Sequence, residues 1–122
     1  MSTITERVER GAALLDERRP GWWRDIDMGT LDIRSPCRCI LGQMGSLLRD
    51  DGSLSRFRAG LDMVKLHVHQ AAEFGFDWSG SGGAYATWDE INRLMDAEDA
   101  ALTAAWRDLI GSRRAAAEAV SC

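Results

Sequence analysis

Apolar residues recur at three- and four-residue intervals along most of this chain, which is the spacing of one face of an α-helix. In the first such segment, Thr3 and Glu6 have the spacing of a capping box that opens a helix. Pro20 and Gly21 end it, because proline lacks the backbone N–H and disfavours helix in the residue before it. The apolar face of this helix comprises Ile4, Val8, Ala12 and Leu15.

Ser35 and Pro36 predict the start of a second helix, since serine caps free N–H groups and proline is well tolerated at the first helical position. Gly42 and Gly45 fall inside this helix, where glycine costs about 1 kcal/mol relative to alanine. Close packing by another element would explain both glycines. The apolar face comprises Cys37, Ile40, Leu41, Met44, Leu47 and Leu48.

A less regular helical pattern covers residues 54–74, and we expect Gly60 to divide it into two pieces. Gly75 closes this stretch as a C-cap. Few β-branched residues are present anywhere, so strand signals are poor.

The longest helical pattern opens at a second capping box, formed by Thr87 and Glu90. Glu98 falls on its apolar face, which predicts either a kink near residues 96–99 or an edge position for this glutamate. The apolar face comprises Ile91, Leu94, Met95, Leu102, Ala105, Trp106, Leu109 and Ile110. The patterns together predict a mainly α protein, a single compact domain of four or five helices over residues 1–119 with a frayed tail at 120–122.

Charge and length narrow the classes of function. The 122 residues suffice for one domain with a core of its own. The net charge is −4, from 15 basic and 19 acidic residues, so we expect no nucleic-acid partner. The acidic residues concentrate after residue 70, which favours a protein partner. No apolar run is long enough to span a membrane and the first residues lack a signal-peptide core, so we expect a cytoplasmic protein without membrane contact.

Three elements occur in order along the chain and are fairly specific in combination. They are Pro20-Gly21-Trp22, then Cys37-Arg38-Cys39-Ile40-Leu41-Gly42-Gln43, then Ala105-Trp106-Arg107. With their surroundings, residues 4–43 and 75–114, the chain resembles a group of short, largely uncharacterised proteins of actinobacteria and their bacteriophages. The resemblance implies a phage or prophage origin and a small accessory role, and it carries no catalytic residues.

Four residues have the chemistry of a zinc site. Cys37, Cys39, His67 and His69 would supply two thiolates and two imidazoles, the set that tetrahedral zinc binds. Residues two apart on a helix point about 200° away from each other, so each pair could bind one ion only outside regular helix. The alternative is that Cys37 is an ordinary core residue on the apolar face of the second helix.

Cys39 is also a candidate nucleophile. A place in the first turn of a helix beside Arg38 would lower the pKa of its thiol, and His67 or His69 would have to act as the base. No residue that would orient such a base is evident in the sequence, so an ordinary first-turn cysteine is the alternative.

Trp22 and Trp23 cannot both point inward on the short helical turn expected at residues 21–26. We expect one to lie in the core and the other to be partly exposed. An exposed tryptophan beside Arg24 is typical of the residues that dominate protein interfaces. The alternative is that both tryptophans fold over the first helix.

The leading hypothesis is a small non-enzymatic interaction or regulatory protein that binds another protein through helical faces. The alternatives are a zinc-binding module and a thiol enzyme. We expect no cofactor, with zinc as the one candidate. A homodimer is also open, because an Ala-rich amphipathic terminal helix often packs against its own copy.

Overall fold

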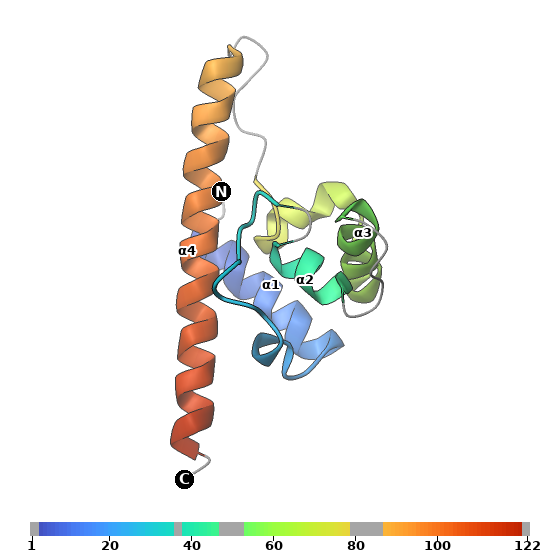
Figure 1. The fold of residues 1–122 in the computed structure, drawn as a ribbon, viewed down its shortest axis with the longest axis vertical. Helices are drawn as coiled ribbons and strands as arrows, with labels where there is room; N and C mark the ends of the chain where they lie inside the picture. Colours follow the sequence, from blue (N-terminus) through green and yellow to red (C-terminus); the bar gives the residue numbers. More distant parts are fainter. Residues whose placement is uncertain (1–2, 36–37, 47–52, 79–86, 121–122) are drawn as a thin grey trace.

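Helices build the part of the chain that the computed structural model describes, which is residues 3–35, 38–46, 53–78 and 87–120, and no strand occurs among these residues. Figure 1 shows α4 running the length of the molecule, with the other helices packed against one side of its middle. The expected mainly α architecture is confirmed. In chain order the elements are α1 (Ile4–Arg18), η1 (Trp22–Arg24), α2 (Ile40–Ser46), α3 (Ser53–Val64), η2 (Val68–Phe74) and α4 (Trp88–Val120), where η marks a 3-10 helix.

The first helix begins and ends as predicted. The backbone N–H of Glu6 donates to the Thr3 hydroxyl at 3.1 Å, and the Thr3 N–H donates to the Glu6 carboxylate at 3.4 Å, which completes the capping box. At the other end Gly21 takes a left-handed conformation with φ of 80°, which turns the chain into η1. The predicted face is also confirmed, with Ile4 packed partly buried against a core that contains Val8, Ala12 and Leu15.

Close backbone contact joins α2 and α3. A β-carbon at Gly45 would overlap the carbonyl oxygen of Arg56, and one at Gly60 would overlap the carbonyl oxygen of Leu41. The close approach expected at Gly45 is therefore confirmed. The stretch is divided into two pieces as expected, α3 and η2, but the expected position of the division is wrong. The helix α3 continues through Gly60 and ends before Lys65, which has a positive φ of 58°.

The second helix starts later than predicted. The turn before α2 is held by the Cys39 N–H, which donates to the carbonyl of Ser35 at 2.9 Å, and helix begins at Ile40. Pro36 and Cys37 lie outside the described residues. The core face expected for α2 is present at Ile40, Leu41 and Met44, which are fully buried.

Trp106 of α4 is the centre of the core. Its ring meets Trp22 edge-on at 5.6 Å and stacks on Phe76 at 5.4 Å, and its indole N–H donates to the Gly75 carbonyl at 2.6 Å. The helix is continuous past Glu98, whose side chain is 13% exposed and is paired with Arg7. Within the described residues, no helix is long and apolar enough to cross a membrane.

Candidate functional site

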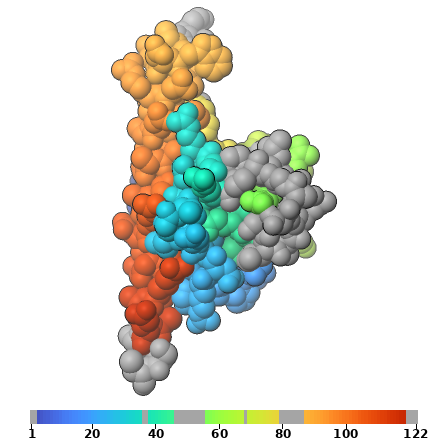
Figure 2. All heavy atoms as spheres, in the orientation of Figure 1, coloured from blue at the N-terminus to red at the C-terminus, as the bar shows by residue number. Residues whose placement is uncertain are grey.

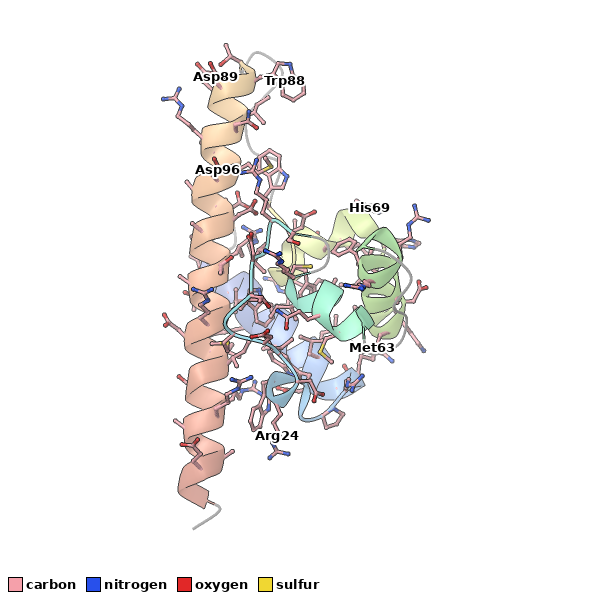
Figure 3. The ribbon with its side chains drawn as sticks, viewed as in Figure 1. Arg24, Met63, His69, Trp88, Asp89 and Asp96 are labelled. Carbon is pink, nitrogen blue, oxygen red and sulfur yellow. The ribbon has the colours of Figure 1, made fainter. Side chains whose placement is uncertain are left out.

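The two adjacent tryptophans take different environments, as expected. Trp22 is fully buried, and its indole N–H donates to Asp16 at 3.0 Å. Trp23 is half-buried, and the guanidinium of Arg24 lies 4.6 Å from its ring centroid. Of the predicted partner-binding residues, Trp23 and Arg24 therefore remain at the surface, whereas Trp22 is unavailable to a partner. Figure 3 shows the Arg24 side chain of η1 pointing outward from the molecule.

Two arginines of α4 anchor this region. Arg113 makes a two-pronged ion pair with Asp16, at 2.6 and 2.8 Å. The hydrogen bonds from Arg113 hold the pKa of the Asp16 carboxyl below its usual value. Arg114 donates twice to the carbonyl of Trp23, at 3.0 and 3.2 Å. The Trp23 backbone is thus fixed, which favours a rigid surface here.

Cys39 is buried, with 1% of its surface exposed, and its sulfur accepts the Gly42 N–H at 3.3 Å. Burial raises the pKa of its thiol to about 12. The predicted direction was the opposite, because the sequence places Cys39 at a helix start beside a cation but does not show its burial. A thiol held protonated is a poor nucleophile.

The histidines do not point apart as helical spacing predicted. His67 and His69 are exposed, and their rings lie parallel, 5.5 Å apart and within 3°. His67 has an extended backbone just before η2, so the angle between successive helical residues does not apply to this pair. The two imidazoles therefore lie on one side of the chain.

Two of the four predicted zinc ligands, Cys39 and His67, line the same cavity. This Cys39 cavity, of about 580 Å³, is lined by Cys39 and His67, by apolar side chains including Phe57, Leu61 and Phe76, and by charged ones at its edge. Cys37 lies outside the described residues. In the part of the chain that the structure describes, no three His, Cys, Asp or Glu side chains gather to hold a metal ion. The zinc site stays a prediction.

The most exposed apolar surface belongs to the first turns of α4. Trp88 is 79% exposed and Leu94 is 45% exposed, and they are the large exposed hydrophobic residues of the described chain. Residues 88–97, named here the α4 tip, extend beyond the body of the molecule, with Trp88 in the first turn of α4 (Figures 1, 2 and 3). At 100° per residue, Trp88 shares the helix face that carries Trp106 in the core. This apolar face therefore continues into solvent.

The sequence pattern does not reveal this surface. Periodicity places Leu94 on an apolar face of the helix but does not indicate whether another element covers that face. The sequence feature that points to exposure of these turns is their acidic character. Asp89, Glu90 and Asp96 are exposed around the apolar residues, with Arg93 the one exposed basic side chain of the α4 tip.

A buried arginine connects the base of the α4 tip to the body. Arg7 donates to the carbonyls of Ala72 and Asp77, both at 2.7 Å, and lies 3.0 Å from the Glu98 carboxylate. The Arg7 and Glu98 side chains are only 9% and 13% exposed. This junction fixes the point at which α4 leaves the body.

Comparison with known protein families, curated proteins and solved structures finds no match to this chain. The resemblance to short actinobacterial and phage proteins accordingly stays a prediction.

Proposed function

We propose that this protein is a non-enzymatic interaction protein, and that the α4 tip binds its partner. The observation that carries the proposal is Trp88, which is 79% exposed at the end of a projecting helix. Tryptophan is the residue type most enriched among those that dominate binding energy, because it buries a large apolar area at low entropic cost. Trp88, Ile91 and Met95 follow one another at intervals of three and four residues, the spacing of one helix face, and such a face is suited to a groove on another protein.

The charge of the α4 tip selects the kind of partner. Asp89 and Glu90 are exposed in the first turn of α4, whereas Asp96 is paired with Arg34, so a groove bordered by lysine or arginine would be complementary to the first turn. Two copies packed through this surface would bring like charges together, which disfavours a homodimer at this site. The proposed partner is therefore a different protein with a basic-edged apolar groove.

The test compares two tryptophans at different places on the surface. Three immobilised proteins are compared: the wild type, Trp88→Ser and Trp23→Ser. Each is incubated with a lysate of the cells in which the protein naturally occurs, and the retained proteins are identified by mass spectrometry. We expect one partner to be retained by wild type and by Trp23→Ser, and released by rising salt. Loss of Trp88 should weaken its binding by about 2 kcal/mol or more, roughly thirtyfold.

Other outcomes would contradict the proposal in recognisable ways. Binding that is lost with Trp23→Ser but kept with Trp88→Ser would move the interface to the Trp23–Arg24 surface. A concentration-dependent dimer that Trp88→Ser abolishes, seen by sedimentation equilibrium, would replace the foreign partner with a second copy.

A further inference from the structure

A second cavity lies where the segment 31–34 crosses α4 below the α4 tip. This Asp99 cavity has a volume of about 620 Å³. Six charged residues line it: Asp32, Arg34, Asp96, Asp99, Arg107 and Asp108. Four carboxyl groups thus face two guanidinium groups, which leaves the cavity with an excess of negative charge. Asp96, labelled in Figure 3, belongs both to this cavity and to the α4 tip.

Asp99 differs from the other acids of the cavity. Only 5% of its surface is exposed, and its Oδ1 atom is buried without a hydrogen-bond partner among the described residues. An ionised carboxylate in such a place is costly unless a donor reaches it. Asp99 therefore lines the cavity with a carboxyl group that has one oxygen buried without a donor from the described residues.

The two guanidinium groups of the cavity have partners other than Asp99. Arg34 forms an ion pair with Asp96, and Arg107 donates to the carbonyl of Leu31 at 3.2 Å. Neither arginine donates to Oδ1 of Asp99.

We propose that the Asp99 cavity binds an alkylammonium or guanidinium group, with Asp99 as its acceptor. A positively charged donor in the cavity matches the excess of carboxylates and offsets the unfavourable burial of the Asp99 carboxyl. Ionic hydrogen bonds of this kind are roughly twice as strong as neutral ones. Two kinds of molecule carry such a cationic group: a protein partner, on a lysine or arginine side chain, and a free organic amine. The proposal does not depend on the partner proposed for the α4 tip, because Asp99, the acceptor, lies outside residues 88–97.

Ionisation of Asp99 supports this reading. Burial, followed by the negative charge of Asp77, raises the pKa of the Asp99 carboxyl to about 6. Glu98 and Asp32 act in the same direction, and Arg34 acts against them. A bound cation would favour the ionised form, so binding should strengthen as the pH rises through this value.

The experiment uses the full-length chain and small probes of one size. Amide NMR spectra are recorded while n-butylammonium, n-butylguanidinium or neutral n-butanol is added at pH 7.5. We expect the two cations, and not butanol, to shift the amide signals of Asp99, Ala100 and Thr103, with millimolar affinity. At pH 5 the same cations should bind more weakly.

Two variants of equal charge change provide the control. Asp99→Asn should weaken binding of the cations by about tenfold or more. Glu17→Gln removes an exposed carboxylate of α1, outside both the cavity and the α4 tip, and should bind as the wild type does. The pKa of Asp99, followed through its carboxyl carbon, should fall in the presence of n-butylammonium. Equal shifts with butanol, unchanged affinity in Asp99→Asn, or an unmoved pKa would each overturn the proposal.

A second titration distinguishes the sources. Spermidine represents a free amine, and lysine capped at both ends represents a protein side chain. Tighter binding of spermidine assigns the site to a free amine, and tighter binding of capped lysine assigns it to a basic side chain. If neither spermidine nor capped lysine binds, and the two butyl cations do not bind either, the proposed site is refuted.

Discussion

Replacement of Asp99 by asparagine should stabilise this protein at neutral and alkaline pH. The carboxyl is 95% buried and one of its oxygens has no hydrogen-bond partner among the described residues, so ionisation is unfavourable in the folded state. Asparagine has nearly the same shape and cannot ionise. The variant therefore removes the charge without opening a void.

The magnitude follows from the pKa of this group. In the folded protein it is about 6, against 3.8 for an exposed aspartate. The proton is therefore held more tightly in the folded state, and the stability this gives is fully present below about pH 4 and lost as the pH rises through 6. About two pKa units correspond to about 3 kcal/mol, which the wild type lacks at pH 8 relative to the asparagine variant.

Urea unfolding followed by tryptophan fluorescence measures this difference, because Trp22 and Trp106 are buried in the core. We expect the variant to exceed the wild type by about 3 kcal/mol at pH 8 and to match it near pH 4. Asp89→Asn, an exposed site on the same helix, serves as the control and should change little at either pH. The pKa of Asp77 is also raised by burial, so a smaller pH dependence should persist in Asp99→Asn. An equal gap at both pH values, or a variant less stable at pH 8, would refute the reasoning.

Three further predictions concern packing, ion pairing and reactivity. Gly60→Ala should lower the free energy of unfolding by about 1–3 kcal/mol, because its β-carbon would overlap the backbone of Leu41. Gly111→Ala, which has open space around it, should raise the free energy of unfolding by about 0.5–1 kcal/mol. Urea titrations of the two variants and the wild type measure both effects. Arg7→Met should lower the free energy of unfolding by about 3–5 kcal/mol, because the nearly buried Glu98 carboxylate loses its ion-pair partner Arg7. If the double variant Arg7→Met, Glu98→Gln does not recover stability, the ion pair is not the cause of the loss. The Cys39 thiol should resist iodoacetamide at pH 8 in the folded protein and react after urea is added, as peptide mass spectrometry can show for that residue alone; rapid alkylation in the folded state would contradict its burial.

Local features of this fold could be predicted from sequence, because each depends on residues close together in the chain. The two capping boxes, at Thr3 and at Thr87, are present as expected. The turn after Pro20 and the C-cap at Gly75 are also present. Residues close together in the chain determine these caps and turns, so the sequence predicts them without any information on the tertiary structure.

Features that depend on distant segments could not be predicted in the same way. The junction at Arg7 joins α1 to residues more than 60 positions away, and nothing in the pattern of α1 indicates it. Gly60 has a packing role that overrides its weak helix propensity. The exposure of Trp88 and the burial of Cys39 likewise depend on what surrounds each helix.

The ion pair between Asp16 and Arg113 joins residues 97 positions apart. All-helical proteins usually fold fast because their contacts are local, but here the core is completed only when α4 packs on α1 and η1. On a growing chain, Trp22 and Phe76 are synthesised well before Trp106, which covers them in the folded protein. The half-made protein would therefore present an apolar face to its surroundings, so its synthesis is the stage at which aggregation competes most strongly with folding.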